Sequence, residues 1–164
     1  MNASVPIIRA NGEGDRQSFL GGGLHTWKLL AEETGGAFFL FEDAMVQGKC
    51  TPLHRHPEAD EMTYVLEGEI VLNVDGKESR LGPGSMSFVP RAVPHAFLVV
   101  SHMARLLTMQ MPGVGQEFYR SASDPTTDDT SETVDIARLQ ASANDNPHGV
   151  ELLGPPPFEP AKAG

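Results

Sequence analysis

The chain has 164 residues, 40% of them hydrophobic and 21% charged, which is enough for one globular domain with a substantial core. Its 12 Lys and Arg against 22 Asp and Glu give a formal net charge of −10, which disfavours binding to nucleic acid or to anionic membranes. Cys50 has no second cysteine to pair with, which excludes an internal disulfide and a thiolate zinc cluster. No apolar run approaches the ~20 residues of a membrane span and the opening residues show no secretory signal, so a cytoplasmic protein is expected.

Short apolar segments separated by Gly and Pro fill the chain from about residue 5 to residue 111. They predict β-strands, because no convincing apolar stripe of helical period runs through them. Chain reversals are expected at Gly68, at the Asp75-Gly76 pair and within "LGPGS". In chain order, the expected strand segments are "HTWKLLAEE", "GAFFLFEDAMV", "EMTYVLEGEIVLNVDGKESRL", "SMSFVP", "HAFLVV" and "ARLLTMQM".

The C-terminal third has a different character. The segment "PGVGQEFYRSA" reads as a short helix that lays Phe118 and Tyr119 onto the sheet. Further on, "SETVDIARLQASA" reads as an amphipathic helix, with Asp129 and Glu132 placed as its cap and N3 residue. The final "HGVELLGPPPFEPAKAG" is rich in Pro and Gly, so we expect it to run extended over the surface.

These elements predict an all-β fold. Many short strands at regular spacing indicate a sandwich or barrel, of which the jelly roll is one common form. We therefore expect a single domain over residues 1–164, with the barrel at about 5–111 and a helical and Pro-rich extension at 112–164.

The stretch "HRHPEADE", residues 54–61, raises the question of function. His54 and His56 share one face of a strand, because side chains two residues apart point to the same side. Glu61 follows after a polar turn at Pro57, and a hairpin there would bring its carboxylate back beside the two histidines. Taken alone, the pair of histidines reads equally well as a polar surface turn.

A third histidine favours a metal site. His95 begins the segment "HAFLVV", directly after an approach stiffened by Pro90 and Pro94. If its side chain points inward, three imidazoles and one carboxylate converge, which suits one divalent transition ion (Fe, Ni, Mn, Cu or Zn) with positions left open for chemistry. The predicted metal ligands are His54, His56, Glu61 and His95, whereas His25, His102 and His148 read as core or surface residues.

Two segments resemble the motifs of the cupin family. "GKCTPLHRHPEADEMTYVLEG" is similar to the first cupin motif, with the expected spacing of Gly48, His54, His56, Glu61 and Gly68. "GPGSMSFVPRAVPH" resembles the second motif through Gly84, Pro90 and His95. The family usually has Gly where Ala92 stands and Asn where Val99 stands, but neither position is a metal ligand.

The resemblance extends to "MQMPGVGQEFYRSASDP" and the later "GVELLGPPP", which look like single-domain bacterial cupins related to quercetin 2,3-dioxygenase. It implies a jelly-roll barrel, four metal ligands of the same types, and Glu61 as a base toward a substrate hydroxyl as well as a ligand. It also implies a dioxygenase that uses dioxygen to cleave a flavonol or another enol-bearing small molecule.

Two other classes of function stay open, because this fold hosts many chemistries. One is a non-enzymatic module that binds a small molecule, and the other is an isomerase or decarboxylase on the same site. A sugar-phosphate pocket needs an Arg or Lys cluster, and Arg55 should face away from its histidine neighbours. Candidates to line an apolar substrate cavity are Phe39, Phe41, Met45, Phe88, Phe97, Met109 and Met111.

The strand that carries Glu61 also bears on assembly. If Glu61 faces inward, strand alternation sends Met62, Tyr64 and Leu66 outward. An outer face as apolar as this needs cover from terminal segments or from a second subunit. Because cupins of this type commonly dimerise, a homodimer is expected.

Overall fold

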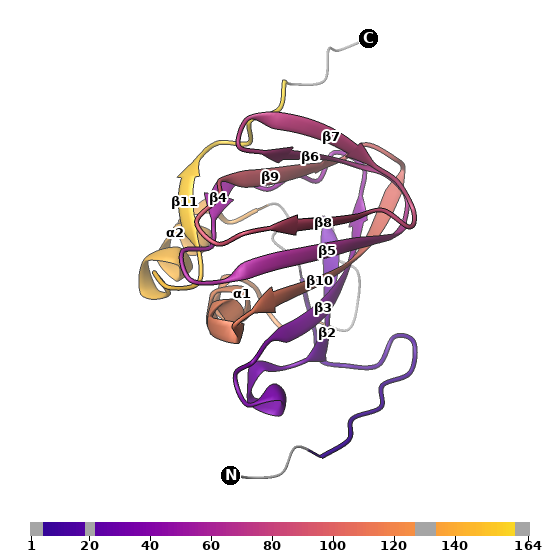
Figure 1. Cartoon of the computed structure of the whole chain (residues 1–164), viewed down its shortest axis with the longest axis vertical. Coiled ribbons are helices and arrows are strands. Elements are labelled where there is room, and N and C mark those ends of the chain that lie inside the picture. The colour runs from indigo at the N-terminus through magenta and orange to yellow at the C-terminus, as the bar shows by residue number, and fades with distance from the viewer. Residues whose placement is uncertain (1–4, 19–21, 127–133, 160–164) are drawn as a thin grey trace.

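The computed structural model describes residues 5–18, 22–126 and 134–159, and these residues form two antiparallel sheets that face each other (Figure 1). Across the first sheet the strands are β1 (Arg16–Ser18), β2 (Gly23–Leu29), β3 (Phe39–Val46), β10 (Met103–Met111), β5 (Asp60–Glu67) and β8 (Met86–Val89). Across the second they are β11 (Glu151–Gly154), β4 (Leu53–Arg55), β9 (His95–Val99), β6 (Ile70–Val74) and β7 (Lys77–Leu81). The expected all-β fold of jelly-roll type is confirmed, in the form of two packed sheets.

Short helices accompany the sheets, and their bounds are η1 (Ala31–Thr34), η2 (Gly113–Gly115), α1 (Gln116–Ala122) and α2 (Ile136–Asp145). The helix η1 replaces the end of the expected strand "HTWKLLAEE", and Gly35 ends it with a left-handed φ of 65°. The expected short helix after residue 111 is confirmed as α1, which carries Phe118 and Tyr119 into the core. Both α1 and α2 lie at the end of the sheets where β4 and β11 meet (Figure 1).

The second C-terminal helix begins later than expected. Its N-cap is Asp135, whose side chain accepts a hydrogen bond from the backbone N–H of Arg138. The capping residues expected from the sequence, Asp129 and Glu132, lie outside the described residues.

The expected extended course over the surface takes the form of an edge strand at residues 151–154, where Leu153 is 40% exposed. These residues form β11, which pairs with β4 and places Leu152 opposite His54. The C-terminal extension therefore completes the sheet that carries two of the candidate ligands.

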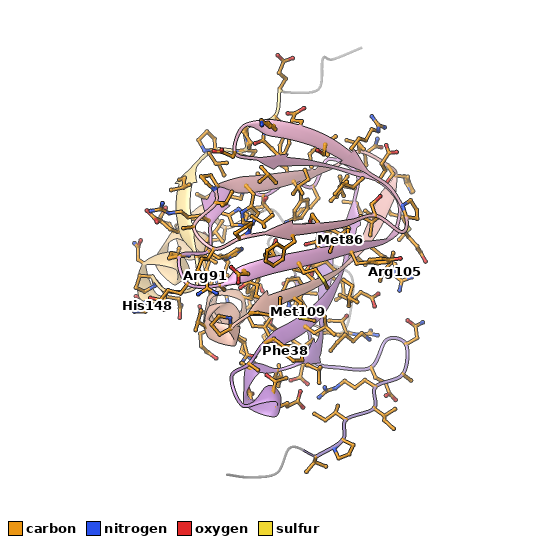
Figure 2. The ribbon with its side chains drawn as sticks, in the orientation of Figure 1. Phe38, Met86, Arg91, Arg105, Met109 and His148 are labelled. Atoms are coloured by element: carbon orange, nitrogen blue, oxygen red, sulfur yellow. The ribbon has the colours of Figure 1, made fainter. Side chains whose placement is uncertain are left out.

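Alternation along β5 follows the expected pattern. Thr63 and Val65 are buried between the sheets, whereas Tyr64 is 40% exposed. Across the neighbouring strands, Met62 lies opposite Phe88 on β8 and Met109 on β10. The outer face of this sheet is therefore apolar over three strands, and Met86 and Met109 mark it in Figure 2.

Two expected reversals have the backbone that the sequence predicts. Asp75 and Gly76, with φ of 50° and 78°, join β6 to β7 in a two-residue hairpin. Gly68 has a φ of 72°, and a Cβ there would collide with the carbonyl of Met103. Glycine is required at residue 68 for both reasons.

The hydrophobic core lies between the sheets and extends under α1 and α2; its largest fully buried apolar side chains include Trp27, Phe39, Met45, Ile70, Leu106 and Leu139. None of the helices in the described part of the chain is long and apolar enough to cross a membrane.

Candidate metal centre

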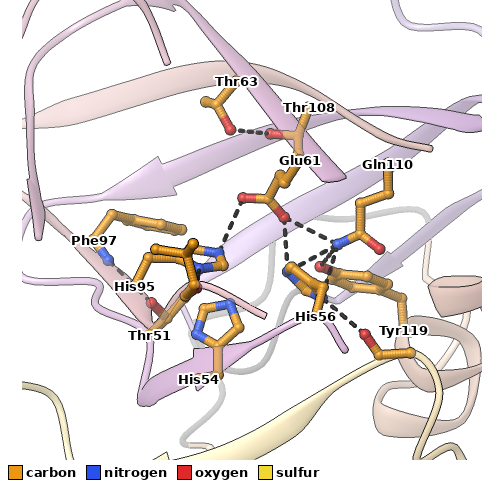
Figure 3. A network of polar contacts seen from close by, with 12 residues as sticks. Thr51, His54, His56, Glu61, Thr63, His95, Phe97, Thr108, Gln110 and Tyr119 are labelled. Carbon is orange, nitrogen blue, oxygen red and sulfur yellow. Dashed lines mark hydrogen bonds and ion pairs between the residues drawn. The ribbon is translucent and has the colours of Figure 1, made fainter. Parts of the chain in front are cut away.

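Three histidines meet on the inner face of the second sheet. His54 on β4 lies directly opposite His95 on β9, and His56 follows two residues after His54 on the same face. The ring centroids of His54 and His95 are 4.4 Å apart, and His56 lies 5.2 Å from each of them. One ring nitrogen of each histidine lies within 4.8 Å of the other two (Figure 3). The structure therefore confirms that the three predicted histidines come together.

Each of the three imidazoles is held through its Nδ1 atom. The nearest acceptors are the backbone carbonyls of Pro52 for His54 (2.8 Å), Gly149 for His56 (2.9 Å) and Val93 for His95 (3.0 Å). Because a carbonyl only accepts, Nδ1 carries the proton in each ring and Nε2 keeps its lone pair. This arrangement is typical of histidines that bind a metal through Nε2.

Glu61 reaches the histidines from the opposite sheet. The expected hairpin return is wrong: the "PEAD" segment carries the chain from β4 in one sheet to β5 in the other. The Glu61 carboxylate then faces the histidines across the interior, with Oε2 3.0 Å from His56 Nε2 and Oε1 3.5 Å from His95 Nε2. At 3.0 Å, the anionic Oε2 of Glu61 faces the Nε2 atom of His56, and the other nitrogen of that ring, Nδ1, already carries a proton. A positive charge is needed between them, either a proton or a metal ion, so the donor set fits a divalent cation.

The protonation states suit that role. Removal from water, together with the charges of His95 and His56, lowers the pKa of His54 to about 3. Burial by itself would raise the pKa of Glu61, but the charge and hydrogen bond of His56, followed by those of His95, bring it well below its usual range. Burial opposes the shift of His95 also, yet the hydrogen bond and charge of Glu61 raise the pKa of that histidine. At neutral pH, His54 is neutral and Glu61 is ionised, which are the forms that bind metal.

Sequence reasoning missed Gln110. Its side chain is fully buried on β10, directly opposite Glu61 on β5. The amide nitrogen donates to Glu61 Oε2 at 2.9 Å and to the Tyr119 hydroxyl oxygen at 2.9 Å (Figure 3). The available signal was the alternation of "TMQM", which places a polar glutamine on the inner face of a strand.

A small, mainly apolar cavity adjoins the centre. Its volume is about 50 Å³, and His54 and Glu61 share its wall with Phe41, Phe97, Phe118 and Tyr119. Side chains from the C-terminal extension, Leu139, Val150 and Leu152, cover it. A cavity of this size holds a few water molecules at most, so an aromatic substrate requires this cover to move.

The expected cavity lining is confirmed only in part. Phe41 and Phe97 line the cavity, whereas Phe39 and Met45 are packed in the hydrophobic core. Phe88 is 53% exposed on the outer face, because it lies opposite the outward-pointing Met62 and its side chain points to the same side of the sheet. The alternation within each strand was correct, but the residues on the two faces of β8 could not be assigned before its partner was known.

The remaining charged candidates lie elsewhere. Arg55 pairs with Glu151 at 2.6 Å, and Arg91 pairs with Asp60 at 2.9 Å. Within the described part of the chain, no Arg or Lys lines the cavity, so the cluster that a sugar phosphate needs is not found there. His25 is buried in the core, while His102 and His148 are exposed, as expected (His148 is labelled in Figure 2).

Ala92 adopts the backbone that glycine favours. Its φ is 65°, and its N–H donates to the carbonyl of His56 at 2.8 Å. This left-handed turn explains why glycine is usual at that position of the second motif. The turn keeps its shape here at the cost of some backbone strain.

Comparisons with known proteins agree with this geometry. Residues 42–109, which span the three histidines and Glu61, match the model of the cupin domain. Quercetin 2,3-dioxygenase of Bacillus subtilis (strain 168) is 31% identical over 124 residues, which cover 76% of this chain but 36% of that enzyme, so the chain spans little more than a third of its length.

Two solved structures have a similar fold. KdgF from Halomonas sp. aligns with a TM-score of 0.60 at 18% identity, covering 66% of this chain and 94% of that one. The polyketide cyclase RemF from Streptomyces resistomycificus aligns with a TM-score of 0.55 at 25% identity, covering 65% of this chain and 80% of that one. The two facing sheets and the converging histidines thus accompany a match to the cupin domain over residues 42–109.

Proposed function

We propose that the protein is a metal-dependent dioxygenase that oxidatively cleaves a flavonol or another small molecule with an enolic hydroxyl. The observation that carries this proposal is the convergence of three imidazoles beside the Glu61 carboxylate at the wall of an aromatic-lined cavity. The similarity to a quercetin 2,3-dioxygenase supports the choice of reaction.

His54, His56 and His95 would hold one divalent ion (Fe, Ni, Mn, Cu or Zn), with Glu61 as the fourth ligand. When bound, the ion would supply Lewis acidity toward the substrate hydroxyl and the chemistry for reaction with dioxygen. With the three imidazoles holding the ion, the Glu61 carboxylate would accept the proton of the hydroxyl. Gln110 keeps that carboxylate in place through its amide N–H.

The surrounding wall would exclude water and orient the substrate. Phe41, Phe97 and Phe118 offer flat apolar surfaces to an aromatic ring. Because the cavity encloses about 50 Å³, entry of a flavonol would displace the cover formed by α2 and β11. The enzyme would then close over its substrate when that cover returns.

The test is substrate-dependent oxygen uptake by protein of measured metal content. An oxygen electrode would follow a panel of flavonols, other enols and diketones, with wild type and Glu61→Gln side by side. Glu61→Gln keeps an oxygen donor but has little basicity, so it should retain much of the metal and lose turnover. Absence of oxygen consumption across the panel, with metal occupancy confirmed, would contradict the proposal.

A non-enzymatic small-molecule-binding cupin is the second candidate. The small volume of the cavity, about 50 Å³, favours it, because a small ligand fits such a pocket more readily than a flavonol does. Such a protein would retain metal and ligand but consume no oxygen in either form of Glu61.

We also propose that the protein forms a homodimer through the outer face of the first sheet. Tyr64, Met86 and Phe88 are 40%, 54% and 53% exposed there, on adjacent strands β5 and β8. An apolar face of this kind is a typical interface between subunits. Light scattering of wild type and of Phe88→Glu at high concentration would check this, and a monomeric wild type would contradict it.

A further inference from the structure

We propose that the Tyr119 hydroxyl donates a hydrogen bond to the substrate, and that its acceptor is a carbonyl oxygen next to the hydroxyl group bound at the metal centre. Tyr119 belongs to α1, outside the segment that matches the cupin domain, and it lines the same cavity as His54 and Glu61. This inference adds a feature of the substrate to the proposed function. It rests on that function, because it takes the substrate hydroxyl to bind at the metal centre.

The first step is the orientation of the Gln110 amide. Gln110 presents its amide nitrogen to the Glu61 carboxylate and donates to Oε2 at 2.9 Å, since a carboxylate oxygen accepts. The same nitrogen lies 2.9 Å from the Tyr119 hydroxyl oxygen. It also lies 3.0 Å from His56 Nε2, but a nitrogen that binds the metal ion no longer accepts a hydrogen bond. With the ion held there, one hydrogen goes to Glu61 and the other to Tyr119.

The second step follows for Tyr119. Its oxygen accepts from Gln110 (Figure 3), so its own hydroxyl hydrogen is directed to another partner. Among residues 5–18, 22–126 and 134–159, no acceptor for this hydrogen lies within hydrogen-bond distance. The ring is buried, so bulk water is not a partner, and the cavity is the space that remains. A buried donor without an acceptor is unfavourable, which is a reason for a ligand atom to occupy that position.

The third step concerns the state of the hydroxyl. Burial, together with the charges of Glu61 and Asp43, raises the pKa of Tyr119 well above its usual value. The hydroxyl therefore stays protonated at neutral pH and serves as a donor rather than as a base.

The relative position of the two groups limits the ligand. Glu61 and Tyr119 both bond the same Gln110 nitrogen, so their oxygens lie within two hydrogen-bond lengths of each other. A ligand whose hydroxyl lies against Glu61 and the histidines can reach Tyr119 only with an oxygen on a nearby carbon. An enol with an adjacent carbonyl has this arrangement, and so does the hydroxyl-ketone edge of a flavonol. A simple phenol lacks the second oxygen.

The experiment uses zinc-loaded protein, because zinc has no redox chemistry and the bound probe is not consumed. The probe is 3-hydroxypyran-4-one, and its 4-thione analogue serves as the matched ligand because sulfur accepts hydrogen bonds weakly. Calorimetry would compare wild type with Tyr119→Phe, which removes one hydroxyl and keeps the ring. Tyr64→Phe is the control, because the chain has two tyrosines and Tyr64 lies on the outer face.

We expect Tyr119→Phe to weaken binding of the pyranone roughly 3- to 10-fold, which is the usual size of one neutral hydrogen bond. The thione should change by less than about 2-fold because its sulfur is a weak acceptor, and Tyr64→Phe should change neither probe. In Gln110→Glu the new carboxylate would accept from Tyr119, so the pyranone should lose affinity although the tyrosine is retained.

Equal pyranone affinity in wild type and Tyr119→Phe, with zinc occupancy confirmed, would overturn the inference and indicate that both oxygens bind the ion instead. Failure of the pyranone to bind at all would overturn it too. Affinity is measured on the zinc form and oxygen uptake on protein with the metal that it carries when purified, so the two results are independent. A loss of affinity in Tyr119→Phe combined with no oxygen uptake by the purified protein would reject the dioxygenase proposal and leave the tyrosine assignment standing.

Discussion

The protein buries histidines in two regions, and their Nδ1 partners differ. His25 lies among the rings of Trp27 and Phe41, at centroid distances of 4.5 and 4.2 Å, and its Nδ1 is 2.8 Å from a carboxylate oxygen of Asp43. The three histidines of the metal centre direct Nδ1 to backbone carbonyls instead, and one nitrogen of each meets the others within 4.8 Å. Burial alone therefore does not identify a metal ligand. The partner of one ring nitrogen determines what the other nitrogen can do.

The largest expected effect follows from removing a ligand. Metal affinity should fall by more than about 100-fold in each of His54→Ala, His56→Ala and His95→Ala. Loss of a residue that only hydrogen-bonds a metal ligand usually costs about 10- to 100-fold, and loss of the ligand itself should cost more. Elemental analysis after dialysis would measure it, with the exposed His102→Ala as control. Full occupancy in any one variant would remove that histidine from the ligand set.

Removing His25 should have the opposite outcome. His25→Leu leaves the Asp43 carboxylate without its partner in the core, where burial already raises its pKa, so the free energy of unfolding should fall by about 3 kcal/mol. Metal content should not change. Chemical denaturation would show the loss, and His102→Leu on the surface should show none. A loss of metal in His25→Leu would undo the distinction between the two regions.

Gly149 tests the carbonyl that holds His56. A Cβ at residue 149 would lie 2.8 Å from the Cα of Gly115, so Gly149→Ala must push the segment away and lengthen its hydrogen bond to His56. Metal affinity should fall roughly 10- to 100-fold, as for the loss of other outer partners of a ligand. Gly154→Ala on β11 is a matched control, because nothing lies within 4 Å of its Cβ. Unchanged affinity in Gly149→Ala would show that the carbonyl is not needed.

Metal affinity should fall as the pH drops below neutrality. Metal binds His95 without its proton. Glu61 raises the pKa of this histidine above its ordinary value near 6.5, so protons compete with the metal at and below that raised pKa. His95 alone should then cost about 10-fold in affinity per pH unit below its pKa, whereas His54, with a pKa of about 3, should not contribute near neutrality. Competition with a chelator at several pH values would measure the slope, and an affinity independent of pH would contradict it.

The smallest expected effect concerns backbone strain beside the centre. Ala92→Gly should raise the free energy of unfolding by about 1 kcal/mol, because glycine adopts the φ of 65° without the Cβ clash. Ala137→Gly, at an exposed position in α2, should lower it by a similar amount. A destabilised Ala92→Gly would mean that the methyl group contributes more than its strain costs.

Local features of the fold were predictable from the sequence because they depend on neighbouring residues. The turns at Gly68 and at Asp75-Gly76 need positive φ, and the residue types show it. His54 and His56 share a face because the side chains of a strand alternate. The start of α2 was misjudged, because several polar residues compete as caps and the one used, Asp135, is identified only by its contact with Arg138.

The sequence determined which side chains could bind a metal, and strand alternation determined which of them lie on the same face of one strand. The tertiary structure alone decided that Glu61 approaches from the opposite sheet, that Gln110 holds it, and that Gly149 orients His56. The alternation of side chains along a strand shows only the face on which each one lies. It does not show which strand lies across the interior. The partners of the centre are separated from it by 49 residues in one case and by 93 in the other, so only the packing of the two sheets and of the C-terminal extension brings them together.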